Sequence, residues 1–76
     1  MSEMEWLRIF ANNLRYYLDT HGISQNELAK RACLEQGSIS RYVSATQMPG
    51  IKAAINIANA LGVTVDELIN FDDMIY

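Results

Sequence analysis

Residues 24–44 read SQNELAKRACLEQGSISRYVS, and this stretch predicts two short helices joined by a tight turn. Ser24 and Glu27 have the spacing of a capping box, in which the serine oxygen accepts from the glutamate amide while the carboxylate reaches back to the serine amide. Residues 33–35 leave room only for a turn before a second helix over 36–44. Two short helices joined in this way cannot lie antiparallel, so we expect them to cross steeply.

A steep crossing requires a small side chain at the point of contact, and Ala29 lies in the middle of the first of these helices. Apolar residues around the turn are expected to anchor the pair to the rest of the fold: Leu28, Ala32, Leu34, Ile39 and Tyr42. With those side chains buried, the second helix must expose its polar side, which carries Gln36, Gly37, Ser40, Arg41 and Ser44. Base edges in the major groove of DNA are recognised by such hydrogen-bonding groups on a protruding helix.

The sequence before this stretch predicts one longer helix over residues 4–20. Apolar residues recur there at helical spacing: Leu7, Phe10, Leu14, Tyr17 and Leu18. His21 and Gly22 follow as a helix end, since glycine readily takes the left-handed conformation that terminates helices.

The sequence after this stretch predicts a loop over residues 45–50 and two more helices. The first covers residues 51–61 with an apolar set of Ala54, Ile55, Ile57, Ala58 and Leu61, and Gly62 ends it. Thr64 to Glu67 is a second capping box, which opens a last short helix through Ile69. We therefore expect an all-α, five-helix fold in which residues 1–76 form one domain.

The composition describes a small packed domain with an acidic balance. Half of the 76 residues are apolar, which favours a folded core over disorder, and no apolar run approaches the ~18 residues that a membrane helix requires. The formal net charge of −3 weighs against nucleic-acid binding, but the acidic residues gather near both ends, so the middle can present a modest positive face. The acidic N-terminus is unlike a secretory signal, and a lone cysteine fits a reducing compartment, so we expect a cytoplasmic protein without membrane contact.

The sequence offers no catalytic or metal-binding pattern. No serine, cysteine or histidine has partners for nucleophilic catalysis, and the carboxylates follow the logic of helix caps. His21 is expected to face water, since no cluster of further metal ligands accompanies it. Cys33 is expected to be a small buried hydrophobe rather than a redox switch. We therefore expect no enzyme activity, no cofactor, no metal and no small-molecule substrate.

Three segments resemble the lambda-repressor-like helix-turn-helix family, which includes the Cro and C1-type phage repressors and the XRE-type bacterial regulators. They are residues 22–29 (GISQNELA), 39–41 (ISR) and 61–68 (LGVTVDEL), and the resemblance extends without a gap over roughly residues 10–69. It implies a five-helix domain that acts as a homodimer on a pseudo-palindromic operator, with its third helix in the major groove. The implied function is that of a prokaryotic or phage transcriptional regulator, a repressor, whose partner is double-stranded DNA.

The resemblance also implies roles for individual residues. Gln25, at the start of the second helix, is similar to a family glutamine that contacts a phosphate and braces the recognition helix. Gln36 stands where the family often places a base-reading side chain, and an amide there can pair with adenine. Arg41 matches a groove-facing arginine that binds guanine or a phosphate. The full set of expected DNA-binding residues is Gln25, Gln36, Gly37, Ser38, Ser40, Arg41, Ser44, Thr46 and Gln47, with the last two as contacts to the DNA backbone.

Three departures from the family pattern concern the ends of the third helix. Cys33 replaces the turn glycine and is expected to take a left-handed conformation at some strain. Glu35 replaces the usual serine cap; it is a poor N-cap and brings an acid toward phosphates unless it accepts from a cytosine. Ala45 replaces the glycine after the helix, and the loop lacks the basic residues common there, which predicts low affinity for the DNA backbone.

A fourth departure concerns an ion pair. Many family members pair an arginine late in the first helix with a glutamate at the end of the recognition helix, where this sequence has Leu18 and Val43. Because both charges are absent together, no buried charge is left without its partner. We expect a direct apolar contact between these two side chains.

Two alternatives stay open at the level of sequence. The tail over residues 71–76 (FDDMIY) is unusually apolar, which favours a dimer contact built with the fifth helix. The tail could instead fold back beside Trp6, or the chain could be the N-terminal domain of a longer protein. The fold could also serve as a protein-interaction module, such as an antitoxin-like partner, which the net acidity and the small loop charge would fit.

Overall fold

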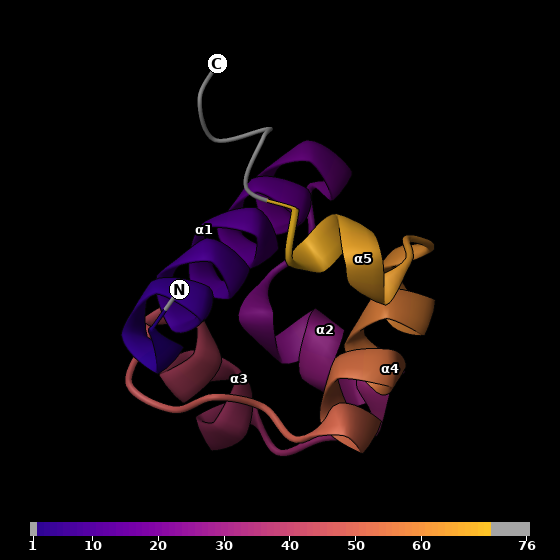
Figure 1. The fold of residues 1–76 in the computed structure, drawn as a ribbon. Coiled ribbons are helices and arrows are strands. Elements are labelled where there is room, and N and C mark those ends of the chain that lie inside the picture. The colour runs from indigo at the N-terminus through magenta and orange to yellow at the C-terminus, as the bar shows by residue number, and fades with distance from the viewer. Residues whose placement is uncertain (1, 71–76) are drawn as a thin grey trace.

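The computed structural model describes residues 2–70, which form five helices connected by turns and one longer loop (Figure 1). The helices are α1 (Glu3–His21), α2 (Gln25–Ala32), α3 (Gln36–Val43), α4 (Ile51–Leu61) and α5 (Val65–Leu68). No strand occurs in this part of the chain, so the predicted all-helical, five-helix architecture is confirmed. The dimer contact expected at residues 71–76 lies outside the described residues.

α1 runs along one side of the molecule, and the four shorter helices gather beside it (Figure 1). α2 packs against α3 and α4, α1 packs against α3 and α5, and α4 packs against α5. The largest fully buried side chains come from all five helices: Phe10, Leu14, Leu28, Ile39, Ile57 and Leu68. Phe10 and Tyr42 also meet edge to face, with ring centroids 6.4 Å apart. One core therefore connects α1 to every shorter helix and fixes α3 relative to the rest.

α1 begins with a complete capping box. Ser2 Oγ accepts from the Glu5 amide (3.2 Å), and the Glu5 carboxylate accepts from the Ser2 amide (3.1 Å). The hydrogen bond from the Ser2 amide, followed by that with the Ser2 hydroxyl, lowers the pKa of Glu5 from its ordinary value. The predicted helix began at residue 4, although the S-x-x-E spacing of this box is visible in the sequence.

A buried asparagine ties α1 to the end of α5. Asn13 is 5% exposed, and its Nδ2 donates to the carbonyl oxygens of Leu68 (2.9 Å) and Asn70 (3.0 Å). Both N–H groups of the amide are thus used on backbone carbonyls at and just after the C-terminus of α5. This contact was not predicted, because it joins residues more than fifty positions apart.

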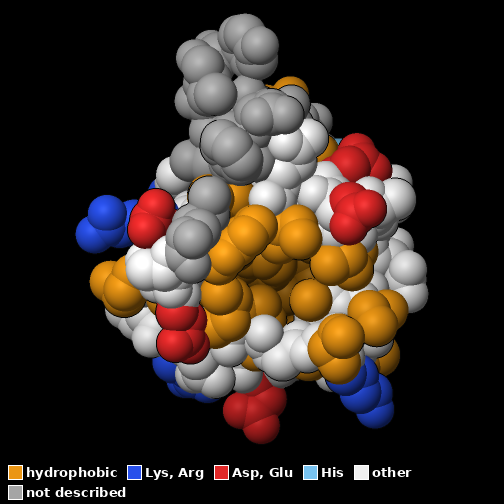
Figure 2. Space-filling view, viewed as in Figure 1, with side chains coloured by type: hydrophobic (Ala, Val, Ile, Leu, Met, Phe, Trp, Pro, Cys, Tyr) orange, Lys and Arg blue, Asp and Glu red, His pale blue; other side chains and the backbone are white. Residues whose placement is uncertain are grey.

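One face of the molecule is predominantly apolar. Figure 2 shows hydrophobic side chains gathered around a hollow between α1, α4 and α5. Across the described surface, and not on this face alone, the exposed large hydrophobic residues lie on α1 and α4: Met4, Trp6, Tyr16, Ile51 and Ile55. Ile55, part of the predicted apolar set of α4, is 43% exposed, whereas Ile57, Ala58 and Leu61 are buried. None of the helices within residues 2–70 is long and apolar enough to cross a membrane.

Candidate nucleic-acid interface

α2 and α3 are held together by the small and apolar side chains that were predicted to do so. Ala29 is 4% exposed, Leu28 and Ile39 are fully buried, and Ala32 and Tyr42 are buried as well. Leu34, in the turn between the two helices, is half-buried and packs against the same core. The predicted anchoring of the helix pair is therefore confirmed.

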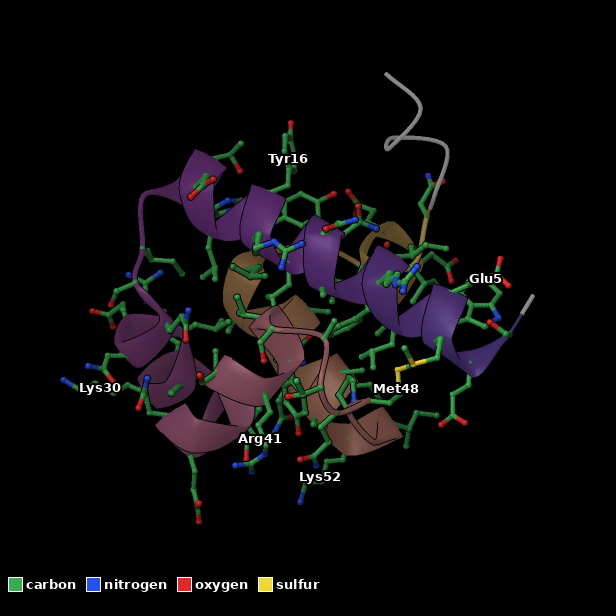
Figure 3. All side chains as sticks on the ribbon, turned by 90° about the vertical axis from the view of Figure 1, so that its left-hand side faces the viewer. Glu5, Tyr16, Lys30, Arg41, Met48 and Lys52 are labelled. Carbon is green, nitrogen blue, oxygen red and sulfur yellow. The ribbon has the colours of Figure 1, made fainter. Side chains whose placement is uncertain are left out.

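The outer side of α3 is polar and open to solvent. Four of the predicted DNA-binding residues are exposed on this helix, namely Gln36, Gly37, Ser40 and Arg41, while Ser38 is half-buried. In Figure 3, α3 lies at the lower edge of the molecule, and Arg41 lies on its outer, solvent-facing side. The structure thus confirms the predicted exposed polar side.

A residue with a left-handed backbone follows each of the two helices α2 and α3. Cys33 has φ 57° and Ala45 has φ 60°. Before α3, the amides of Cys33 and Leu34 donate to the carbonyls of Lys30 and Ala29 (3.3 and 2.9 Å), which closes α2. After α3, the amides of Ala45 and Thr46 donate in the same pattern to the carbonyls of Tyr42 and Arg41 (3.2 and 2.9 Å). Both are Schellman motifs, in which glycine is the usual left-handed residue.

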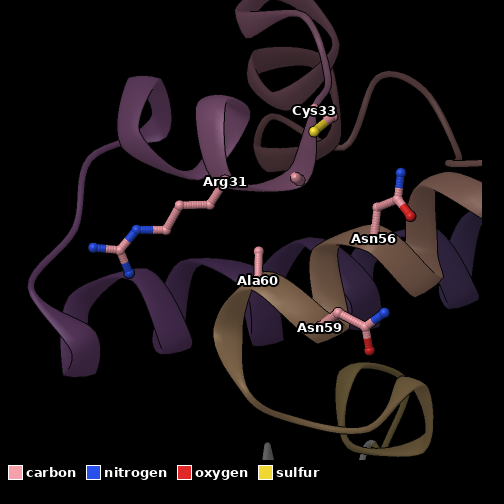
Figure 4. Close-up of a pocket in the computed structure, with 6 residues that line it drawn as sticks. Arg31, Cys33, Asn56, Asn59 and Ala60 are labelled. Atoms are coloured by element: carbon pink, nitrogen blue, oxygen red, sulfur yellow. The ribbon is translucent and has the colours of Figure 1, made fainter.

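The side chain of Cys33 is exposed, so the expectation of a small buried hydrophobe is wrong. The physical reason is the Schellman motif, in which the residue after the left-handed one makes the apolar contact. Here that residue is Leu34, which packs on the core. Cys33 instead lines a cleft of about 290 Å³ between α2 and α4, together with Asn56 and Asn59 (Figure 4).

The N-terminal caps of α2 and α3 differ in strength. Ser24 Oγ accepts from the Glu27 amide at 3.1 Å, as predicted. The returning half of the predicted capping box is not formed, because the Glu27 carboxylate pairs with Arg31 one turn along the helix (3.4 Å). Glu35 caps α3 without any side-chain hydrogen bond, as expected of a poor N-cap. Its exposed carboxylate adds negative charge at the N-terminus of α3.

Arg41 is the centre of a hydrogen-bond network that joins α3 to the following loop. Its Nε donates to Gln47 Oε1 (2.6 Å), and its Nη2 donates to Ser38 Oγ (3.3 Å). Its carbonyl accepts from the Thr46 amide (2.9 Å), from Thr46 Oγ1 (3.2 Å) and from Ser44 Oγ (3.3 Å). The structure therefore brings together five residues that were predicted separately as DNA contacts.

This network limits what the loop can offer to DNA. Each hydroxyl carries one proton; the hydroxyls of Ser44 and Thr46 both lie within hydrogen-bond distance of the Arg41 carbonyl and 3.1 Å from each other, so their two protons serve two of these three contacts at a time. While these bonds hold, neither hydroxyl can donate to a phosphate. Gln47 differs, because only its Oε1 bonds to another residue in the range 2–70 and the two N–H groups of its Nε2 stay available.

Gln25 lies apart from this network, at the start of α2. It is half-buried and lines a cleft of about 340 Å³ with Arg15, Leu18 and Val43, among others. Arg15 donates from Nη1 to the Val43 carbonyl (2.6 Å) and also bonds to Asn12, so a guanidinium group of α1 stabilises the C-terminus of α3. Leu18 and Val43 line the same cleft, and their direct contact stays a prediction.

Positive charge gathers on the side of the molecule formed by α2, α3 and the start of α4. The exposed side chains of Lys30, Arg41 and Lys52 lie there in Figure 3, whereas Tyr16 extends from the opposite side. Neither lysine was among the residues predicted to contact DNA. The position of Lys52 could have indicated a contact with DNA, because Lys52 lies in the first turn of α4, where the helix dipole disfavours a cation.

Known proteins share this architecture. The sequence model of the helix-turn-helix family matches residues 14–68. An uncharacterized HTH-type transcriptional regulator of Methanocaldococcus jannaschii is 29% identical over 62 residues, which cover 82% of this chain and 94% of the relative. The crystal structure of a hypothetical transcription factor from Neisseria is similar with a TM-score of 0.85 and 24% identity, over 97% of this chain and 87% of that chain.

Proposed function

This chain belongs to the helix-turn-helix family, and from that premise we propose that it is a transcriptional regulator that binds double-stranded DNA in a sequence-specific manner. The observation that carries the proposal is the division of α3 into two sides. Ile39 and Tyr42 are buried in the core, while Gln36, Ser40 and Arg41 are exposed on the outer side. A helix held in this way can enter the major groove without disturbing the core.

The exposed side chains of α3 suit the chemistry of base edges. The Gln36 amide can donate to N7 and accept from N6 of one adenine, and the Arg41 guanidinium can donate to O6 and N7 of a guanine. Ser40, between them, can donate to or accept from several bases. We therefore propose that α3 reads a short half-site containing both an A·T and a G·C pair.

Contacts to phosphates are proposed for three side chains around α3. Lys30 and Lys52 flank Arg41 on the same side of the molecule, and Gln25 presents an amide at the N-terminus of α2. Each neutralised phosphate contributes about −0.9 to the slope of log K against log salt concentration. The two lysines therefore predict a weak slope of roughly −2 per bound chain.

We propose that the protein acts as a homodimer on an operator with two-fold symmetry, whose half-sites lie about one helical turn apart. The apolar face between α1, α4 and α5 supports this proposal (Figure 2). Ile51 is 82% exposed and Ile55 is 43% exposed on α4, and burial against a second copy would remove such surface from water. Occupancy of a promoter by the dimer would repress transcription by excluding the polymerase.

Oligomeric state tests the dimer directly. Sedimentation equilibrium of the full chain should show a reversible dimer, and Ile55→Lys should shift the protein to monomer while its circular dichroism spectrum stays helical. Tyr16→Lys is a control, because Tyr16 is also exposed on α1 but extends from the side opposite α3 in Figure 3. A wild-type protein that stays monomeric up to millimolar concentration would contradict the dimer.

Selection from a random pool of double-stranded DNA, at low and at moderate salt, tests DNA binding. The wild-type protein should enrich a two-fold symmetric sequence, and Arg41→Ala should weaken binding to that sequence by about 1–3 kcal/mol. Asn59→Ala is a matched control, since Asn59 is exposed on α4 outside the proposed interface. If no sequence is enriched and no DNA is retained even at low salt, the proposed function is wrong.

That negative result would favour a second candidate, a protein-interaction module on the same fold. The net charge of −3 and the apolar face between α1, α4 and α5 are the observations that support this candidate. An interaction module would tolerate Arg41→Ala and lose its partner in Ile55→Lys. A DNA-binding regulator would show the strongest loss in Arg41→Ala.

A further inference from the structure

Resting on the proposed DNA-binding function, we propose that Gln47 is a positioning residue that determines specificity: it sets the orientation in which Arg41 meets a base. The family resemblance assigns Gln47 only a contact to the DNA backbone. In the structure, the Oε1 of Gln47 accepts from Arg41 Nε at 2.6 Å, which is a short hydrogen bond with a charged donor. Gln47 therefore acts on the DNA through Arg41.

The two hydrogen bonds of the Arg41 guanidinium lie on one edge of the group. Nε and Nη2 share that edge, and they donate to Gln47 Oε1 and Ser38 Oγ respectively. A guanidinium has five N–H donors, so the two on Nη1 and the second on Nη2 remain. Nη1 and Nη2 together form the end of the group, whose parallel N–H bonds match O6 and N7 of a guanine. The network occupies the side edge and leaves the end free for a base.

Gly37 leaves room for this orientation. A Cβ placed on Gly37 would lie 3.5 Å from Arg41 Nη1, in ordinary van der Waals contact. The guanidinium therefore lies back along α3, over the turn that precedes Arg41, which is the direction that long helical side chains take. A larger side chain at this position would occupy the space next to Nη1.

The loop holds Gln47 in place by bonding to Arg41 itself. The amide and hydroxyl of Thr46 donate to the Arg41 carbonyl, and the Ser44 hydroxyl supports the same oxygen. The main chain of Arg41 thus positions residue 46, and the following residue, Gln47, positions the side chain of Arg41. Without Gln47, the long arginine side chain would regain rotamer freedom that must be lost again on binding.

Two substitutions of similar size separate positioning from direct DNA contact. Gln47→Met keeps the length of the side chain but removes the acceptor, whereas Gln47→Glu keeps an acceptor for Arg41 and loses the Nε2 donors. In a selection from random DNA, Gln47→Met should broaden the base preference at one position of the site, and this should be the position at which Arg41→Ala loses its preference. Its affinity for the best wild-type sequence should fall about 3- to 10-fold, which is the effect expected for one side chain that is no longer pre-ordered.

Gln47→Glu should keep the base preference while affinity falls for all sequences, because the added carboxylate repels phosphates. In an Arg41→Ala background, Gln47→Met should cause no further change in base preference. In the free protein, the Nε–H signal of Arg41 should exchange slowly with water in the wild type and in Gln47→Glu, and quickly in Gln47→Met. This NMR measurement requires no DNA.

Three outcomes would overturn the inference, and they are distinguishable. If Gln47→Met lowers affinity equally for all sequences and leaves the base preference intact, Gln47 contacts the DNA backbone and only the positioning role is wrong. If the wild-type protein enriches no sequence at all, the proposed function is wrong and the inference is wrong with it. An Arg41 Nε–H signal that exchanges equally fast in all three proteins would also overturn the inference.

Discussion

Replacement by glycine of the two left-handed residues that follow α2 and α3, Cys33 and Ala45, should stabilise the protein. Cys33 (φ 57°) and Ala45 (φ 60°) hold the same position in a Schellman motif that Gly22 (φ 66°) and Gly62 (φ 71°) hold after α1 and α4. In a left-handed residue, Cβ lies too close to the following carbonyl oxygen. α2 and α3 therefore end in strained backbone, whereas α1 and α4 end without this strain.

The size of the effect follows from two opposing terms. A left-handed conformation costs an L-residue about 1–2 kcal/mol, and the greater freedom of glycine in the unfolded chain offsets about 0.5–1 kcal/mol of the gain. Cys33→Gly and Ala45→Gly should thus each raise the free energy of unfolding by about 0.5–1 kcal/mol. For a chain of this length, that corresponds to an increase of about 2–8 °C in Tm.

Thermal and urea unfolding followed by circular dichroism measure these changes. Gly22→Ala and Gly62→Ala are the matched reverse variants, and each should lower the free energy of unfolding by about 1 kcal/mol. A Cβ at either position meets no atom within 4 Å, so their loss reports the conformational cost without a clash. If both reverse variants destabilise the protein while Ala45→Gly leaves Tm unchanged or lower, the argument from backbone strain at α3 is refuted.

Three further predictions concern other parts of the fold. Glu35→Ser should give α3 a side-chain cap worth about 0.5–2 kcal/mol and strengthen DNA binding at low salt; an unchanged urea midpoint would contradict it. Asn13→Asp should lower the free energy of unfolding by about 1–3 kcal/mol, because the carbonyls of Leu68 and Asn70 lose the Nδ2 donor. The same substitution at the exposed Asn59 should have a much smaller effect. Equal effects would refute the role of Asn13. Because the pKa of Glu5 is lowered in the folded state, the ionised Glu5 carboxylate stabilises the folded protein above the ordinary glutamate pKa, and this stabilisation is lost as pH falls through the lowered value. In an NMR titration, Ser2→Ala should raise the pKa of Glu5. A pKa that does not move would contradict the capping box.

The helices and their ends could be predicted closely from the sequence, because their signals are local. Gly22 and Gly62 end helices where expected, and Thr64 and Glu67 form the complete capping box that their spacing indicated. The box predicted at Ser24 formed only in part. A second partner, Arg31, was in reach of Glu27 one turn later, and spacing alone does not rank two partners of one carboxylate.

The candidate site could be predicted as a set of residues but not as an arrangement. The exposure of Gln36, Ser40 and Arg41 follows from helical periodicity once Ile39 and Tyr42 are assigned to the core. The bond between Arg41 and Gln47 depends on the path of a loop, for which periodicity carries no information. For the same reason the sequence did not predict that Arg15 bonds to the end of α3.

By itself, the sequence determined to within about one residue where each helix starts and stops, and which side of α3 is polar, since these properties depend on neighbours within one or two helical turns. Only the tertiary structure decided that Asn13 holds the end of α5, that Leu34 rather than Cys33 packs on the core, and that the guanidinium of Arg41 lies along its own helix. These outcomes depend on which groups meet across turns and between helices. Hydrogen-bond donors and apolar side chains take the partners that packing brings within reach, and packing is a property of the whole chain.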